Sequence, residues 1–162
     1  MGQRSHSGPL VKTKRYLQVV DFLYRDHAGE HSDDIVAAPG PEQEELSVIN
    51  SFQNSWNRRD PDGMDAAFHF PHVRIASGRI HVLEKGWRGE DFFERFIERT
   101  GWDYSLWDYR RAVQSTYSKV HFAVKFSRYR SDGTLIGSYP SMWIVALIDG
   151  RWGVQSRSSF AP

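Results

Sequence analysis

The chain has 162 residues, in which 21 Lys and Arg oppose 20 Asp and Glu and give a formal net charge of +1. Hydrophobic residues make up 40% of the chain, aromatic residues make up 14%, and there is no Cys. A chain of this length forms one domain, or one domain with an extension, and buries roughly 70% of its unfolded surface. Without Cys, disulfides, thiolate zinc sites and cysteine nucleophiles are excluded.

Charge and hydropathy argue against two further classes. A nucleic-acid-binding protein usually carries a basic excess, which this chain lacks. No apolar run reaches the roughly 20 residues that span a bilayer, and no apolar segment follows Arg4 as a signal peptide would require. With the absence of Cys, these features predict a cytoplasmic protein without a nucleic-acid or membrane partner.

Residues 1–41 are predicted to form an N-terminal extension. Its polar start, residues 2–9, is expected to be disordered, and an apolar patch over 16–24 predicts a short helix that docks on the main domain. Gly and Pro in residues 28–41 are typical of a linker. The main domain is then residues 42–162.

Three helices are expected in this domain. An acidic start and an apolar stripe predict a helix over 42–58. Asp60-Pro61-Asp62-Gly63 predicts a second, short helix that ends at Phe68, before Pro71. Aromatic residues at helical spacing predict a third helix over 90–99. The stripe of the first helix consists of Leu46, Ile49, Phe52 and Trp56.

The remaining segments are predicted to be strands. Asp132-Gly133 and Asp149-Gly150 are strong signals for two-residue hairpin turns. The resulting order, α-α-β-β-α-β-β-β-β, indicates an α+β fold that ends in a meander. The predicted strands are 73–75, 80–82, 104–115, 117–130, 135–148 and 151–160.

The two hairpin turns fix which strand residues share a face. Cross-strand partners lie on the same side of a sheet, so one face combines aromatic side chains with hydroxyls. Such a face is typical of a small-molecule pocket, although hydroxyls at a sheet end also bond to backbone or water. A β-bulge would shift the alternation. The predicted pocket residues on this face are Phe122, Phe126, Tyr139, Ser141, Trp143, Ser156 and Ser158.

The opposite face of the predicted sheet is half apolar. An incompletely polar sheet face often meets a partner, and we interpret this one as the surface of a two-fold homodimer. It carries His121, Ala123, Lys125, Pro140, Met142, Ile144, Ile148, Gln155 and Arg157.

Five segments, in their order along residues 42–161, resemble the nuclear transport factor 2-like superfamily and, within it, the SnoaL-like proteins. The resemblance implies a cystatin-like α+β barrel, in which a curved mixed or antiparallel sheet wraps as a cone around about three helices. It also implies a pocket inside and a dimer across the convex face. The segments are the acidic-started helix 42–58, Asp60-Pro61-Asp62-Gly63, Phe70-Pro71-His72-Val73, Gly86-Trp87-Arg88-Gly89 and Asp149-Gly150-Arg151-Trp152.

The superfamily includes ketosteroid isomerase, polyketide cyclases, scytalone dehydratase and non-catalytic binding domains. The isomerase and cyclase pattern implies an acidic base on the first hairpin, where residues 73–77 contain no Asp or Glu. Scytalone dehydratase-like chemistry implies pocket histidines, which His69 and His72 match in type.

His69 and His72 are candidate general bases, because the imidazole pKa lies near neutral pH. The alternative is a loop pair that caps helix ends or faces water. Strand alternation favours that alternative, since Val73 and Ile75 are expected in the core and would turn His72 and Arg74 outward unless the strand start is bulged. Two histidines without a third ligand predict no metal site.

Asp103 is the third catalytic candidate, because a carboxyl group packed among aromatic side chains has a raised pKa. The alternative is a solvated residue at a strand edge. Arg74 and Arg157 could together bind an anion, although the predicted register places Arg157 on the dimer side, where a salt bridge is the simpler role.

The sequence therefore predicts a domain that binds a small hydrophobic organic ligand in an aromatic-lined pocket, as a homodimer and without a cofactor. One alternative is an isomerase, cyclase or dehydratase that transfers a proton on a small hydrophobic carbonyl compound. Its base would be His72, His69 or Asp103, and Tyr139 would hydrogen-bond the carbonyl oxygen. The other alternative is a dimeric protein-interaction module whose pocket is filled by its own side chains.

Overall fold

A computed structural model describes residues 41–162, so the predictions made for residues 1–40 lie outside the described residues. The described chain contains helices and strands in the predicted order. The helices are α2 (Pro41–Asn57), α3 (Pro61–Ala66) and α4 (Phe92–Thr100). The strands are β1 (Phe68–Ala76), β2 (Arg79–Leu83), β3 (Tyr104–Thr116), β4 (Lys119–Tyr129), β5 (Leu135–Ile148) and β6 (Arg151–Ser159).

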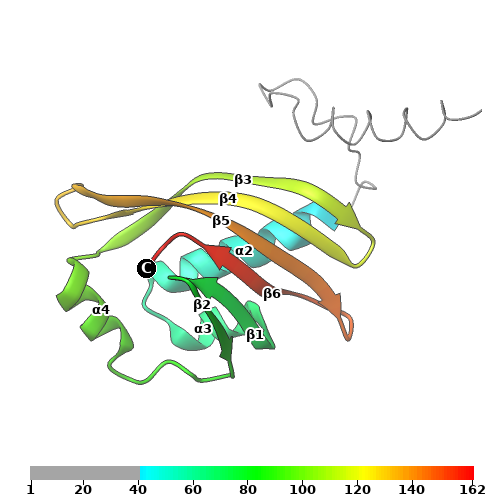
Figure 1. Ribbon diagram of the computed structural model, residues 1–162, viewed down its shortest axis with the longest axis horizontal. Coiled ribbons are helices and arrows are strands. Elements are labelled where there is room, and N and C mark those ends of the chain that lie inside the picture. The colour runs from blue at the N-terminus through cyan, green and yellow to red at the C-terminus, as the bar shows by residue number, and fades with distance from the viewer. Residues whose placement is uncertain (1–40) are drawn as a thin grey trace, which may run out of the picture. The chain divides into compact units, whose positions relative to one another are not determined.

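The six strands form one curved sheet in the order β2-β1-β6-β5-β4-β3. Neighbouring strands are antiparallel, except for the parallel pair of β1 and β6. Helix α2 runs along one face of the sheet and contacts both β3 and β6, and α4 lies at one end of the long strands (Figure 1). The predicted α+β fold with a curved mixed sheet is thus confirmed. Within residues 41–162, no helix is long and apolar enough to cross a membrane.

Local sequence explains where the short helices begin and end. The Asp60 side chain caps α3 by accepting a hydrogen bond of 2.9 Å from the Gly63 amide. Helix α4 ends at Gly101, which has a φ of 67° and donates its amide to the Ile97 carbonyl at 2.7 Å. Glycine adopts this left-handed conformation without a steric penalty, so it stops the helix as expected.

Strand β1 begins earlier than predicted. The short helix ends at Ala66, and Phe68 already pairs with Val154 of β6, so the predicted helix end at Phe68 and loop over 69–72 are wrong. The β1–β6 pairing is irregular between Phe68 and Val73, and Pro71 lies in that irregular stretch. Proline lacks an amide donor, and a strand tolerates it at such a position.

The register of β4 and β5 is as predicted up to Arg128 and shifts by one residue next to the turn, where Tyr129 pairs with Leu135. The register of β6 is only partly as predicted. Phe122 pairs with Trp143, and Phe126 pairs with Tyr139, as expected. Next to the Asp149-Gly150 turn, Val145 pairs with Val154, but the register then shifts between Ile144 and Val145. Gln155 is the extra residue of this bulge.

The bulge reverses the predicted faces of the end of β6. Arg157, not Ser156, pairs with Trp143, and Ser159, not Ser158, pairs with Ser141. The expectation that Ser156 and Ser158 lie on the aromatic face is therefore wrong, and so is the placement of Arg157 on the outer face. One extra residue changes which side chains point inward, because side chains alternate along a strand.

An aromatic cluster forms the core between the helices and the sheet. Trp56 of α2 lies 5.3 Å from Phe96, 5.4 Å from Trp102 and 5.5 Å from Phe93, measured between ring centroids. Edge-on contacts of this kind add to the hydrophobic stabilisation of the core. The Trp102 side chain is fully buried, and its Nε1 donates to Ser105 Oγ at 2.9 Å.

Candidate functional site: an aromatic cavity with five arginines

The concave side of the domain holds a cavity of about 290 Å³. Aromatic side chains from α2, α4, the loop before α4 and three strands form most of its wall. They are Phe52, Trp56, Trp87, Phe92, Phe96, Trp107, Phe126 and Trp143. The polar lining consists of Gln53, Ser105, Ser141, Ser159, Arg74, Arg88, Arg99, Arg128 and Arg157, and Ala161 and Pro162 complete it.

Three of the seven predicted pocket residues line this cavity, namely Phe126, Ser141 and Trp143, and so does Arg74, the predicted anion-binding candidate. The Ser141 hydroxyl donates to the Ser158 carbonyl at 2.7 Å and accepts from Trp143 Nε1 at 3.0 Å. Ser141 thus bonds to the backbone, which is the alternative that the sequence left open for these hydroxyls.

The other four predicted pocket residues lie outside the cavity wall. Phe122 is buried in the core, and the Tyr139 ring packs beside the wall, 5.6 Å from the Phe126 ring. Ser156 and Ser158 face the other side of the sheet because of the bulge in β6.

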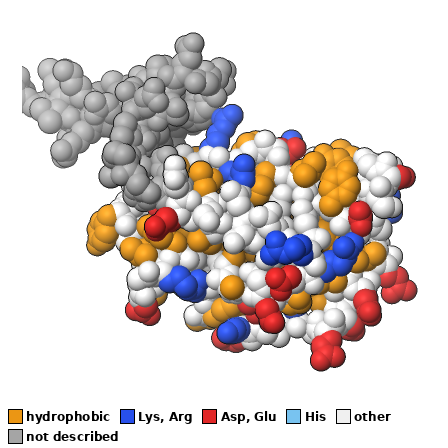
Figure 2. All heavy atoms as spheres, turned by 180° about the vertical axis from the view of Figure 1, so that it is seen from behind, with side chains coloured by type: hydrophobic (Ala, Val, Ile, Leu, Met, Phe, Trp, Pro, Cys, Tyr) orange, Lys and Arg blue, Asp and Glu red, His pale blue; other side chains and the backbone are white. Residues whose placement is uncertain are grey.

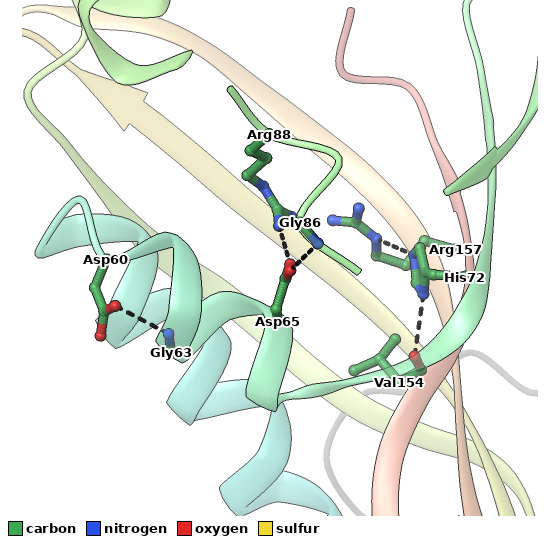
Figure 3. A network of polar contacts seen from close by, with 8 residues as sticks. All are labelled: Asp60, Gly63, Asp65, His72, Gly86, Arg88, Val154 and Arg157. Atoms are coloured by element: carbon green, nitrogen blue, oxygen red, sulfur yellow. Dashed lines mark hydrogen bonds and ion pairs between the residues drawn. The ribbon is translucent and has the colours of Figure 1, made fainter. Parts of the chain in front are cut away.

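His72 is fully buried behind the cavity wall, and both of its ring nitrogens are engaged (Figure 3). Its Nε2 lies 3.0 Å from Arg157 Nε, and its Nδ1 lies 3.1 Å from the Val154 carbonyl oxygen. Since the arginine Nε only donates, Nε2 accepts this hydrogen bond, and Nδ1 carries the proton that it donates to Val154. Burial, reinforced by the positive charge of Arg157, lowers the pKa of His72 to about 3.

The prediction that strand alternation turns His72 and Arg74 outward is wrong. The alternation of β1 starts at Phe68, which lies in the core, so the even-numbered His72 and Arg74 also point inward while Val73 and Ile75 do not enter the core. Arg74 lies beside Arg157 across the parallel β1–β6 pair. Its Nη2 donates to the carbonyls of Ala161 at 3.1 Å and Pro162 at 3.3 Å.

The other two catalytic candidates lie away from the cavity. His69 Nε2 is 3.0 Å from the Ala146 carbonyl oxygen, and its Nδ1 lies 2.9 Å from Arg151 Nη2. The Asp103 carboxylate forms an ion pair of 2.9 Å with Arg59, and its side chain is 45% exposed. Asp103 is thus the solvated edge residue of the alternative prediction. In the described part of the chain, no three His, Asp or Glu side chains are grouped as metal ligands.

Arg157 lies against three aromatic rings at the base of the cavity. Its guanidinium carbon is 4.7 Å from the Phe68 ring centroid and 5.2 Å from those of Phe52 and Trp143. Burial and the nearby arginines hold its pKa well below the usual value. Apart from the Nε contact with His72, Arg157 makes no hydrogen bond among residues 41–162, so both Nη groups remain available.

Arg128 occupies a similar aromatic environment on β4, two strands away from Arg157 in the sheet. Its guanidinium carbon lies 5.0 Å from the ring centroids of Phe96 and Tyr139 and 5.5 Å from that of Phe126. The residue is 8% exposed, and its buried Nε has no hydrogen-bond partner in the described structure. Burial lowers its pKa to about 10, so the side chain remains positively charged at neutral pH.

Arg88 differs from these two because it has a carboxylate partner. Asp65 accepts hydrogen bonds from Arg88 Nη1 and, at 2.7 Å, from the Gly86 amide, as Figure 3 shows. Both members of this ion pair are buried. The pair holds the loop before α4 against α3, and the Arg88 guanidinium carbon lies 4.5 Å from the Trp87 ring.

The charged side chains of the cavity wall are therefore all positive. Among the described residues, no Asp or Glu lines it, although five arginines do. Many acidic side chains lie on the outer surface, and several gather at the lower right of Figure 2. The cavity is thus aromatic and cationic.

Sequence reasoning missed Arg128, Arg88 and Arg99 as cavity residues. Arg128 follows Phe126 by two positions in β4. Because side chains alternate along a strand, this spacing places Arg128 on the same face and could have predicted its position in the cavity. Arg157 required knowledge of the bulge. Arg88 and Arg99 lie before and at the end of α4, where no strand alternation applies.

The fold and the cavity define an α+β domain of the NTF2-like class. The profile of the NTF2-like protein family DUF6841 matches residues 44–159, and the chain belongs to this family. A search of curated proteins finds no match.

Solved structures share the fold at low sequence identity. A Nostoc punctiforme protein of unknown function with a cystatin-like fold is 16% identical, with a TM-score of 0.61, and the match covers 74% of this chain and 89% of that one. An NTF2-like protein from Cytophaga hutchinsonii is 15% identical, with a TM-score of 0.58 and coverages of 76% and 99%. A ketosteroid isomerase-like protein from Erwinia carotovora atroseptica is 13% identical, with a TM-score of 0.53 and coverages of 73% and 93%.

Proposed function

We propose that this domain binds a small organic molecule in the aromatic cavity. The observation that carries the proposal is a cavity of about 290 Å³ that the surrounding aromatic side chains leave unfilled. Small-molecule sites are concave and mainly apolar, with a few placed polar groups, and this volume is at the lower end of their range. An unfilled cavity favours ligand binding over an interaction module with a filled pocket.

The proton-transfer alternative has less support from the candidate bases. A general base must reach the proton that it abstracts with a free lone pair. The Nε2 lone pair of His72 accepts from Arg157, and the Nδ1 of this ring donates to the backbone. His69 and Asp103 do not line the cavity. We therefore place binding first.

The experiment compares two serines that are adjacent in β6. The full chain is titrated by calorimetry with 2-naphthoate and with the neutral 2-naphthamide, and saturable binding of at least one probe is expected. Ser159→Phe places an aromatic ring into the cavity and should weaken binding at least tenfold. Ser158→Phe, on the other face, should leave it unchanged. If neither probe binds, or if both variants bind like the wild type, the proposal is wrong.

We also propose that a second copy of the domain pairs with the outer face of the sheet. Support comes from hydrophobic side chains that this face exposes: Ile75 is 47% exposed, Ile80 is 72%, Val82 is 62% and Met142 is 39%. Paired positions connect them, because Ile75 lies between Ile80 and Ser158, and Ser158 pairs with Met142. Such a continuous exposed patch is typical of an interface.

A further inference from the structure

We infer that the ligand of this cavity is an anion: a flat, largely apolar molecule that carries a carboxylate, sulfonate or phosphate group. The inference rests on the proposed function and specifies its ligand class. The charges of the cavity wall, its available hydrogen-bond donors and the rings that surround them support this ligand class.

The charges of the cavity wall are not balanced. Of the five arginines in the wall, Arg88 is paired with Asp65. Of the other four, Arg128 is buried, Arg157 and Arg74 are half-buried and Arg99 is exposed, and none of them has an Asp or Glu partner among residues 41–162. A buried cation without a partner is costly, because water no longer solvates it and the local dielectric constant is low. An anion in the cavity would supply the missing counter-charge.

Arg157 and Arg128 each lie against several aromatic rings and keep hydrogen-bond donors available. His72 accepts from Nε of Arg157, which fixes the guanidinium plane and leaves its two Nη groups as a fork. Arg128 is held among the rings and beside the Tyr139 hydroxyl, and its Nε lacks a partner in the described structure. A guanidinium fork matches the two oxygens of a carboxylate, and it also fits phosphate and sulfonate.

The other cavity arginines have different roles. Arg88 holds Asp65, and Arg74 donates to the carbonyls of Ala161 and Pro162. Arg99 is exposed at the end of α4. This comparison selects Arg157 and Arg128 as the residues that bind the anionic group.

The aromatic part of the cavity wall fits the apolar part of such a ligand. Phe126, Trp107 and Trp143 line the cavity, and the ring centroids of Trp107 and Trp143 lie 5.6 Å apart. Aromatic walls favour a planar apolar group through stacked and edge-on contacts. The buried Nε1 of Trp107 also has no partner among the described residues.

The experiment compares probes of one shape and different charge. The full chain is titrated by calorimetry with 2-naphthoate, 2-naphthalenesulfonate, 2-naphthyl phosphate and the neutral 2-naphthamide at one ionic strength. We expect the best anion to bind at least tenfold more tightly than the amide, and the ranking of the three anions to identify the preferred group. If the amide binds as tightly as every anion, the inference is wrong while the proposed function stands. If no probe binds, both are wrong.

Matched variants test the two arginines. Arg157→Met and Arg128→Met should each weaken binding of the preferred anion at least tenfold and change amide binding less than threefold. Arg111→Met, which removes an exposed arginine on the outer face, should change neither. Circular dichroism checks folding, and the wild-type comparison of anion and amide decides the inference even if both variants unfold. Equal loss of anion and amide binding in folded variants would contradict it.

Discussion

The Nε2 atom of His72 lies 3.0 Å from Nε of Arg157, and this contact explains the states of both side chains. The histidine must be neutral to accept the hydrogen bond, and the arginine is oriented by donating it. The Phe68 ring lies parallel to the imidazole, 4.0 Å away between centroids, and covers it. His72 is therefore a positioning residue for a buried cation.

The neutrality of His72 predicts a loss of stability in acid. Its pKa is about 3 in the folded chain against an ordinary histidine value of 6.5, so the unfolded chain takes up a proton at a higher pH than the folded one. The stabilisation is complete above pH 6.5 and decreases as pH falls toward 3. At pH 5 this residue alone should lower the free energy of unfolding by about 2 kcal/mol relative to pH 7.5.

Urea unfolding at the two pH values measures this effect. His72→Gln removes the titrating group, so the difference between pH 7.5 and pH 5 should be about 2 kcal/mol smaller than in the wild type. An unchanged difference would show that His72 does not have the lowered pKa.

The two ion pairs of Asp65 and Asp103 should differ sharply in their effect on stability. Asp65→Asn leaves Arg88 buried without a carboxylate partner, so we expect a loss of about 3 kcal/mol in the free energy of unfolding. Asp103→Asn breaks an exposed pair with Arg59 and should cost less than about 1 kcal/mol. Urea denaturation of both variants gives the comparison, and similar losses would contradict it.

Gly153 leaves room for the ring of His69. A Cβ at this position would lie 2.8 Å from His69 Nε2, whose hydrogen bonds restrict its movement. Gly153→Ala should therefore lower the free energy of unfolding by about 1–3 kcal/mol through overpacking. Gly89→Ala is the control, because its Cβ would come closest to the Asp91 side chain, at 3.2 Å. Equal thermal shifts for the two variants would refute this packing role for His69.

The proposed homodimer can be tested on the outer face. Ile75→Glu and Met142→Glu each place a charge on the hydrophobic patch, so they should convert a dimer into a monomer in light scattering at micromolar concentration. Tyr117→Glu, at the β3–β4 turn, is the control for an exposed hydrophobic side chain outside the patch. A monomeric wild type, or dimers in all variants, would count against this surface.

Local patterns predicted much of the fold. The spacing of apolar residues in α2 and α4 and the Asp-Gly turns each report a short-range preference of the chain, and the β4–β5 register follows from one turn. The early start of β1 depends on its parallel pairing with β6, a strand far away in the sequence. No local sequence pattern predicts such a contact. The short helix that follows Asp60 was therefore predicted to continue to Phe68, which belongs to β1.

The candidate site could be predicted less well for the same reason. Strand alternation along β4 and β5 predicts that Trp143, Ser141 and Phe126 share the face that lines the cavity. Arg157 does not, because the bulge at Gln155 is visible only in the pairing of β5 with β6.

The bulge at Gln155 also decides which β6 side chains line the cavity. With an uninterrupted β6, Ser156 and Ser158 would face the cavity, and two hydroxyls would suit a neutral carbonyl compound. With Gln155 as an additional residue, the Arg157 guanidinium occupies that place. For the proposed anionic ligand, deletion of this single codon would take Arg157 out of the cavity and leave Arg128 there, which gives related domains a route to weaker anion binding.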